Sequence, residues 1–201
     1  MQQTVGGKTS ARGDLAITHI RPKRPSLLWR LTNFRHWWRG FWRKELAALA
    51  GIPTMIGEVA IKVFHADGSV TDYGVVSYRV VTTAYVTALA TNQFDGSAPA
   101  PTAFDYHDCG TGTNAEASGD TALQTPYGGA RTNGTPTNPS AGVYRNTGTI
   151  AFTSTLAITE HGVFSASSAG TLLDRSVFTA VNVINGDSIQ FQYSLTYAAG
   201  G

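Results

Sequence analysis

The chain has 201 residues, of which 42% are hydrophobic and 14% are charged. This length suits one large domain, or a domain with a long arm, and the apolar fraction is sufficient for a core. The charged fraction is below the roughly 25% of an average soluble protein. The single cysteine, Cys109, excludes an intrachain disulfide, and no apolar run reaches the roughly 18 residues of a membrane-spanning helix.

The small net charge of +2 hides a division of the chain into two parts. Residues 1–50 contain ten Lys or Arg and two acids, a net charge of +8, whereas residues 51–201 contain five Lys or Arg and eleven acids, a net charge of −6. All four tryptophans also lie in the first part. The composition therefore predicts a basic, aromatic N-terminal arm followed by a weakly acidic body.

Residues 1–25 are expected to form a flexible arm, because glycines and two prolines, Pro22 and Pro25, interrupt any regular pattern. The first residues lack the apolar core of a signal peptide, so we expect no secretion signal. Arg12, Gly13 and Asp14 match the integrin-binding tripeptide, but a match of three residues is readily explained by chance.

Residues 26–50 are predicted to form an amphipathic helix, which Ser26 can cap and which Gly51 and Pro53 can end. Gly40 weakens its middle by about 1 kcal/mol relative to alanine, so a kink or two half-helices is expected. Apolar side chains recur at intervals of three and four, and arginines lie beside them. The apolar positions are Leu27, Leu31, Phe34, Trp38, Phe41, Trp42, Leu46 and Leu49.

This helix has four possible roles: docking to a protein partner, packing on its own body, membrane-surface binding or nucleic-acid binding. We favour docking, because Trp and Arg most often dominate protein interfaces, and we expect neither a membrane nor a nucleic-acid partner. The predicted partner-binding residues are Trp29, Arg30, Phe34, Arg35, Trp37, Trp38, Arg39, Phe41, Trp42 and Arg43.

The body, residues 57–201, is predicted to be all-β, with turns every 8–14 residues and no strong helix. Strands are expected over 58–65, 104–109, 121–125, 149–159, 171–184 and 188–197, and 70–76 with 77–90 are expected to form one or two more. A further strand is expected to start at 163, and a long loop or ragged hairpin is expected over 126–142. A tight turn is expected at Asn185-Gly186. About eight or nine strands of this kind indicate an antiparallel β-sandwich of jelly-roll type.

The alternation of side chains is clearest in two stretches. Within 149–159, one face is expected to carry Ile150, Phe152, Ser154, Leu156 and Ile158. Within 188–197, one face is expected to carry Ile189, Phe191, Tyr193, Leu195 and Tyr197. A period of two is the pattern of a half-buried strand.

Candidate catalytic residues are few. His107 and Cys109 would share one strand face, but no third group completes a nucleophilic site, so a buried thiol and a strand-end imidazole are expected. Asp174 and Arg175 suggest either a local ion pair or an intersubunit contact. Gly110-Thr111-Gly112 lacks the lysine and the helix of a phosphate-binding loop and is interpreted as a turn.

Glu160, His161 and Gly162 are expected to form an exposed turn at the end of the strand. A metal site that combines Glu160 and His161 with His65 or His107 from another strand is the alternative. We expect no enzyme activity, no cofactor and no metal.

Several blocks of the body resemble a set of uncharacterised virion proteins of tailed bacteriophages. They comprise FDYHDCGTGT (104–113), DTAL (120–123), GTI (148–150), LAITEHGVFSA (156–166), GTLLDRSVF (170–178) and NGDSIQFQY (185–193). The resemblance covers roughly residues 104–201, and the ITEHG and LLDRS segments are its most specific parts.

The resemblance implies a virion component, assembled in the host cytoplasm. Its size and predicted architecture favour a non-enzymatic capsid decoration (cement) protein, a homo-oligomer and in particular a homotrimer, that binds the major capsid protein or another virion protein. A tail fibre, collar or head–tail connector component is the alternative, and a carbohydrate-binding or hydrolase β-sandwich is a further one.

Overall fold

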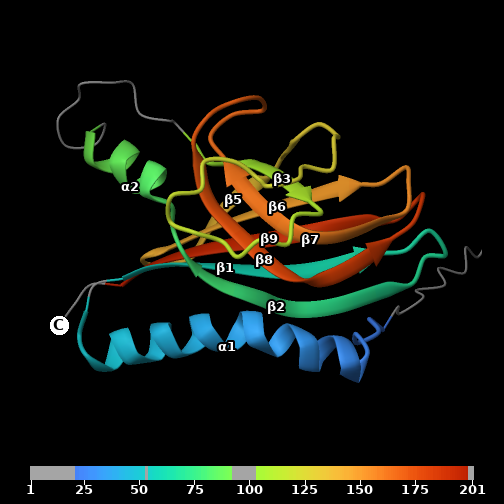
Figure 1. The fold of residues 1–201 in the computed structure, drawn as a ribbon, viewed down its shortest axis with the longest axis horizontal. Coiled ribbons are helices and arrows are strands. Elements are labelled where there is room, and N and C mark those ends of the chain that lie inside the picture. The colour runs from blue at the N-terminus through green and yellow to red at the C-terminus, as the bar shows by residue number, and fades with distance from the viewer. Residues whose placement is uncertain (1–20, 53, 92–102, 199–201) are drawn as a thin grey trace, which may run out of the picture.

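The computed structural model describes residues 21–52, 54–91 and 103–198, and this part folds into two antiparallel β-sheets with few helices, as predicted (Figure 1). The first sheet has the strand order β2-β1-β9-β6-β5 and the second β4-β3-β7-β8. The strands are β1 (Thr54–Phe64), β2 (Val70–Val80), β3 (Tyr106–Gly110), β4 (Thr132–Asn133), β5 (Thr135–Ser140), β6 (Val143–Ala151), β7 (Leu156–Phe164), β8 (Leu172–Val183) and β9 (Ser188–Ala198). The helices are α1 (Leu27–Leu49) and α2 (Thr83–Leu89).

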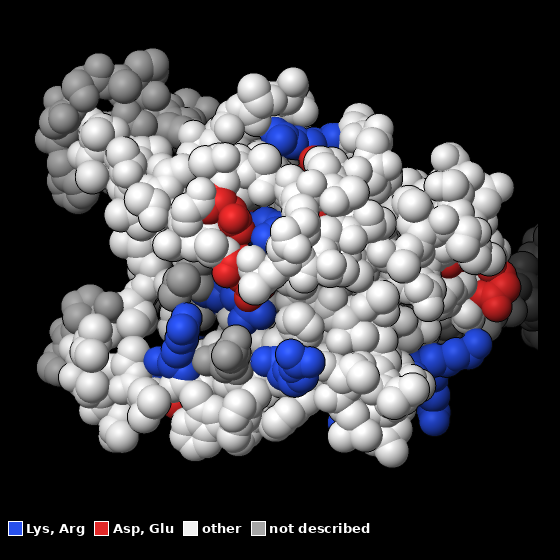
Figure 2. All heavy atoms as spheres, in the orientation of Figure 1, with Lys and Arg blue, Asp and Glu red and all other residues white. Residues whose placement is uncertain are grey.

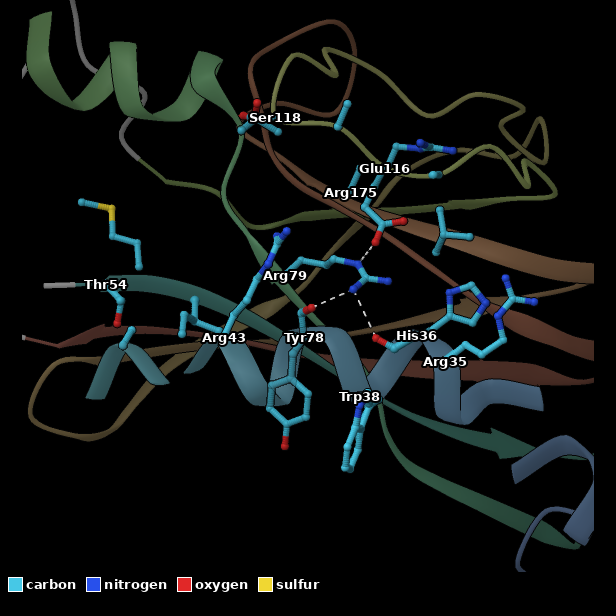
Figure 3. Close-up of a pocket in the computed structure, with 18 of the residues that line it drawn as sticks. Arg35, His36, Trp38, Arg43, Thr54, Tyr78, Arg79, Glu116, Ser118 and Arg175 are labelled. Carbon is cyan, nitrogen blue, oxygen red and sulfur yellow. Dashed lines mark hydrogen bonds and ion pairs between the residues drawn. The ribbon is translucent and has the colours of Figure 1, made fainter. Parts of the chain in front are cut away.

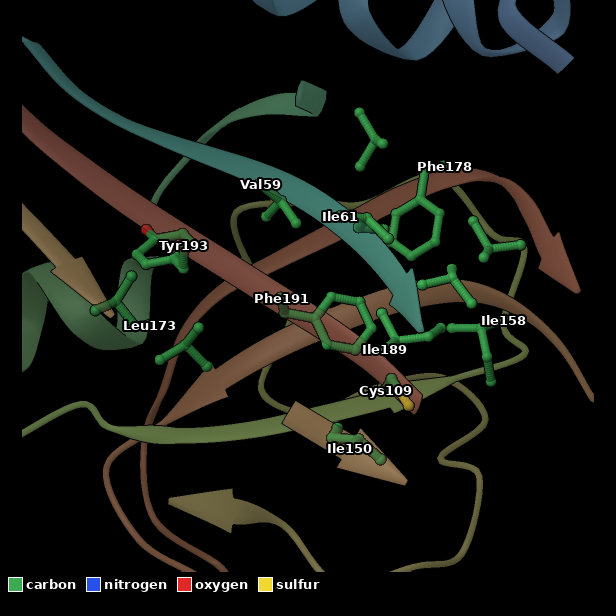
Figure 4. Close-up of a cluster of buried hydrophobic side chains, with 14 of the residues drawn as sticks. Val59, Ile61, Cys109, Ile150, Ile158, Leu173, Phe178, Ile189, Phe191 and Tyr193 are labelled. Carbon is green, nitrogen blue, oxygen red and sulfur yellow. The ribbon is translucent and has the colours of Figure 1, made fainter. Parts of the chain in front are cut away.

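The hydrophobic core lies between the two sheets, and β9 is at the centre of the first (Figure 4). Its alternating pattern places Ile189, Phe191, Tyr193 and Leu195 in the core, as the sequence predicted, whereas Tyr197 at the end of the strand is partly exposed. Opposing residues of the second sheet complete the core; they include Cys109, Ile158, Leu173 and Phe178. The predicted turn at residues 185–186 is present, with a positive φ of 90° at Gly186.

The prediction of a single strand over residues 149–159 is wrong. Its first part belongs to β6 in the first sheet and its second part to β7 in the second sheet. The chain crosses between the sheets at 152–155, where Phe152 exchanges backbone hydrogen bonds with the 186–187 turn. The alternation of apolar residues continues through this corner because Phe152 points into the same core as Ile150 and Ile158, so the pattern conceals the break.

Two other predicted strands differ from the structure. The first residues of 77–90 continue β2, as one of the two predicted possibilities. The second half of 77–90 forms α2, because the Thr82 side chain accepts a hydrogen bond from the Tyr85 amide and caps a helix. Residues 121–125 form no strand; there the amides of Gln124 and Thr125 donate to the carboxylate of Glu160 instead of to a neighbouring strand.

Helix α1 runs along the side of the sandwich where the two sheets present their edge strands β2 and β8 (Figure 1). Asn33 joins both edges: its Nδ2 donates to the Val76 carbonyl of β2 (2.9 Å), and its Oδ1 accepts from the Thr179 amide of β8 (3.0 Å). Trp29 Nε1 donates to the carbonyl of Ala180 (2.8 Å). The helix therefore caps edge groups that would otherwise be open to pairing with another chain.

The helix does not break into two halves at Gly40, since α1 is continuous from Leu27 to Leu49. Gly40 is buried, and a Cβ at this position would overlap the carbonyl oxygen and Cβ of Tyr78. The glycine thus allows the helix backbone to approach β2 closely. The expected cap is present, since the Trp29 amide donates to Ser26 Oγ (3.2 Å), and Gly51 ends the helix with a positive φ of 62°. Pro53, the other half of the predicted stop, lies outside the described residues.

Candidate partner-binding site

Helix α1 has two opposite faces with different roles. The inner face, which includes Trp29, Asn33 and Gly40, packs on the sandwich. The opposite face carries large apolar side chains that the described chain leaves exposed, and we refer to them as the outer stripe. It consists of Leu27, Leu28, Leu31, Phe34, Trp38, Trp42, Leu46 and Leu49. Exposure along it is substantial, for example 64% at Leu31 and 57% at Leu46.

The aromatic side chains of the outer stripe pack against each other along the helix. The ring centroids of Phe34 and Trp38 lie 4.9 Å apart, and those of Trp38 and Trp42 lie 5.2 Å apart with their planes at 78°. Such spacing, one helical turn apart, is typical of favourable aromatic pairs. The stripe is therefore a largely ordered surface, which reduces the conformational entropy that a partner would have to remove on binding.

The ten residues predicted to bind a partner do not share one face. Phe34, Trp38 and Trp42 belong to the outer stripe, whereas Trp29 faces the sandwich. The rings of Trp37 and Phe41 stack at 4.6 Å, and both contact Tyr78 of β2, so they pack on the body's flank. Arg30, Arg35 and Arg43 are exposed. The side chain of Arg39 lies outside the described part.

A groove of about 910 Å³ lies between α1 and the loop 113–118 (Figures 2 and 3). We call it the arginine groove. Its lining includes Arg35 and Arg43 of α1, Arg79 of β2, Arg175 of β8, and small uncharged side chains of the loop. Figure 3 shows Arg43 and Arg79 in the same part of the groove and Arg35 with His36 at another.

Arg79 holds the groove together. Its guanidinium donates to the carbonyls of His36 (3.2 Å) and Tyr78 (3.0 Å) and pairs with Glu116 of the loop. Burial, then the charges of Arg79 and Arg35, lower the pKa of His36. The two arginines therefore add to the effect of burial in keeping the His36 imidazole neutral.

Arg175, at the floor of the groove, is engaged by acids of its own chain. Its Nε donates to Glu160 (2.7 Å) and its Nη1 to Asp120 (3.1 Å). Glu160 is fully buried and also accepts from the amides of Gly112, Gln124 and Thr125. Asp174 and Arg175 therefore form no ion pair with each other in this chain, and the local pair is instead Arg175 with Glu160.

Most described acids of the body are bonded within it, so few of its carboxylates are left to pair with the basic arm. The internally bonded acids are Asp105, Asp108, Glu116, Asp120, Glu160, Asp174 and Asp187. In contrast, no described cation between residues 21 and 49 takes part in a salt bridge. Arg30, Arg35 and Arg43 of α1 are therefore available to an external anionic partner, whereas Lys44 lies over the ring of Tyr78.

The predicted exposed turn at residues 160–162 is wrong, because these residues lie within β7 and both Glu160 and His161 are buried. His107 Nδ1 lies 2.9 Å from His161 Nε2, and His107 Nε2 lies 2.8 Å from Asn146 Oδ1. Since that oxygen can only accept, His107 donates from Nε2 and accepts from His161. Burial lowers the pKa of both imidazoles, which favours this neutral pair.

The remaining chemical candidates are separated. Cys109 is buried in the apolar core, and burial raises the pKa of its thiol far above the usual value. His65 contacts Asp187 and Thr71 at a strand end, apart from the other histidines. Within 21–52, 54–91 and 103–198, no group of three His, Cys, Asp or Glu has a metal-binding arrangement. Residues 12–14 lie outside the described chain.

Asp174 is a buried carboxyl, and sequence reasoning considered it merely as a neighbour of Arg175. Ser176 Oγ donates to Asp174 Oδ1 (2.9 Å). The other oxygen and the Tyr193 hydroxyl both lie against Gly57, and neither has a partner of normal geometry in the described chain. Burial raises the pKa of Asp174 to about 7, against the opposing effects of Ser176, Arg79 and the nearby Tyr193 hydroxyl.

Comparison with known proteins found no matching family model, curated protein or solved structure. Among the described helices, none combines the length and the apolar character needed to cross a bilayer.

Proposed function

We propose that this chain is a non-enzymatic structural subunit of a tailed-phage virion that attaches to the particle through the outer stripe of α1. In this proposal the sandwich is a jelly-roll body, the subunits form a homotrimer, and the role is that of a capsid decoration protein. The sequence resemblance in residues 104–201 supports the virion assignment, and the low charged fraction suits a surface of protein–protein contacts.

The observation that carries the proposal is the outer stripe. A helix that serves merely to cap its own sandwich needs one apolar face, and α1 already uses its inner face for that purpose. Contiguous exposed apolar surface with aromatic residues is typical of interaction sites. Burying the exposed parts of these eight side chains would contribute on the order of 8 kcal/mol before the costs of association are subtracted.

The charge of the helix supports an anionic partner surface. Its cations make no salt bridges within the described chain, whereas most described acids of the body are internally bonded. An acidic surface would be attracted to α1, and salt would weaken this attraction. Removing residues 1–50 would delete both the cap of β2 and β8 and the docking stripe, so such a truncation could not test docking alone.

Particle composition tests the assignment. We expect mass spectrometry of purified virions to find the chain in both complete particles and tail-less heads, at a constant ratio to the major capsid protein. A chain that is present in tails and absent from tail-less heads would exclude the decoration role and favour the fibre, collar or connector alternative. A chain absent from all particles would refute the virion assignment itself.

A further inference from the structure

The arginine groove opens directly beside the outer stripe. Phe34 and Trp38 belong to the stripe and also line the groove, so a partner bound on the stripe would extend to the groove entrance. Its volume of about 910 Å³ lies within the range of about 300–1,000 Å³ that is usual for ligand sites. The groove is therefore large enough to receive part of a partner rather than only solvent.

We propose that the arginine groove receives an extended, acidic segment of the docking partner, whose carboxylates pair with Arg35 and Arg43 and whose apolar side chains contact Trp38 and Met55. This inference rests on the proposed function and specifies the chemistry of the partner at the same site.

The charges of the lining favour carboxylates. At the floor of the groove, Arg79 forms a salt bridge with Glu116. Arg175 forms salt bridges with Asp120 and Glu160. At the rim, Arg35 and Arg43 are exposed and form no salt bridge within the described chain. The groove thus keeps a net positive charge at its mouth.

The walls favour a segment with apolar side chains as well as acids. Trp38, Met55 and Ile56 supply apolar surface, and the loop wall is formed largely by small residues such as Ala115 and Ala117. A chain segment with alternating acidic and apolar residues could direct its carboxylates to the arginine rim and its apolar side chains to this surface.

The groove is held open by contacts within the protein. Arg79 joins the loop, through Glu116, to the carbonyl of His36 in α1. Arg175 and the buried Glu160 fix the loop from below, through Asp120 and the amide of Gly112. A preformed site loses less conformational entropy on binding than one that must first be ordered.

Two other occupants fit these features less well. A second copy of the chain would bring another arginine-rich α1, while most of its described acids are bonded internally. A bilayer surface could cover the outer stripe, but it could not enter a concave space between a helix and a loop. A protein segment satisfies both the shape and the charge.

Peptide titration of the ¹⁵N-labelled full chain tests the inference. The probe is acetyl-Glu-Leu-Glu-Phe-Glu-amide, and the control peptide has Gln in place of each Glu. We expect the acidic peptide to shift the Trp38 indole and Gly40 amide resonances saturably and the control peptide to bind at least about fivefold more weakly, a loss reached with a few exposed ion pairs. Equal binding of the two peptides would overturn the inference.

Charge-reversal variants locate the site. Arg43→Glu should lower the affinity for the acidic peptide about five- to tenfold. Arg43→Gln should lower it less, and this milder variant keeps the test valid if the charge reversal disturbs folding. Arg145→Glu, which makes the same change of charge on β6, should bind within about twofold of the wild type. Unchanged affinity in both Arg43 variants would overturn the inference.

The failure of this inference is separable from the failure of the proposed function. If Arg43→Glu still binds particles with wild-type affinity while changes in the outer stripe abolish binding, the groove is not used although the docking role stands. If the chain instead co-sediments with vesicles of phosphatidylcholine and phosphatidylglycerol and the acidic peptide shows no binding, the choice of a protein segment is wrong.

Discussion

Replacing Asn33 by alanine should separate α1 from both edge strands of the sandwich. The substitution removes the hydrogen bonds to the Val76 carbonyl (2.9 Å) and from the Thr179 amide (3.0 Å). Asn33 is buried, so both backbone groups would lose their partner without gaining free access to water. Each such group costs about 1–3 kcal/mol, and the better helix propensity of alanine returns about 0.5 kcal/mol. We therefore expect the free energy of unfolding to fall by about 1.5–5.5 kcal/mol.

Urea denaturation at 25 °C, followed by circular dichroism, measures this loss. Thr32→Ala is the matched control, because Thr32 is exposed and its hydroxyl donates merely to Leu28 and Trp29 of its own helix. Its unfolding free energy should stay within about 0.5 kcal/mol of the wild type. Amide exchange at Thr179 should accelerate in Asn33→Ala alone. Two variants that denature alike, with Thr179 equally protected, would refute the capping role of α1.

Two further substitutions test the close packing and the buried carboxyl. Gly40→Ala should destabilise the protein by about 1–3 kcal/mol, despite the higher helix propensity of alanine, because the new Cβ would overlap Tyr78. Thermal melts measure this loss. The control Gly119→Ala, which has open space around its Cβ, should melt like the wild type. Asp174 has a pKa of about 7 when folded and 3.8 ordinarily, so the folded state holds its proton between these values and wild-type stability should fall as pH rises from about 4 to 7. Asp174→Asn removes this dependence and should be more stable than wild type at pH 8, by up to about 4 kcal/mol at 1.36 kcal/mol per pH unit. Equal stability differences between variant and wild type at pH 5 and pH 8 would contradict this account of Asp174, since the other groups titrate in both proteins.

Regular local patterns explain which parts of the fold were predictable. The last strand and its turn follow from the alternation of Ile189, Phe191 and Tyr193 and from Asn185-Gly186, because each signal is local and each agrees with the tertiary packing. The same rule failed at 149–159. There the apolar alternation persists through a crossing between sheets, and the pattern of one face cannot show that the chain changes its partner strands.

Sequence periodicity did not show which face of α1 contacts the sandwich. The apolar stripe was evident, but its position relative to the body was not. The residues that seat the helix are Trp29, Asn33 and Gly40, at spacings of four and seven, and a polar and a small residue give no hydrophobic signal. Their shared spacing could have suggested a close helix–strand contact.

The internal use of the acids could not be predicted, because it depends on contacts between distant residues. Glu160 accepts from Arg175, fifteen residues away, and from the loop amides of Gly112, Gln124 and Thr125. The net charge of the body therefore gave a misleading impression of its surface. Glu160 lies in the ITEHG segment and Arg175 in the LLDRS segment, and both side chains are buried. These two segments therefore have a structural role, since they hold the loop against the second sheet.

Occupancy on particles that lack the protein tests most directly whether the outer stripe attaches it. Purified wild type and a Leu31→Gln/Leu46→Gln double variant would each be added to such particles and quantified after sedimentation. Both leucines are more than half exposed, so the variant should fold and melt like the wild type. Because burying two leucines is worth about 2–4 kcal/mol at this exposure, we predict that its affinity for particles falls by more than about tenfold. Equal occupancy of a folded double variant would contradict the docking role of α1.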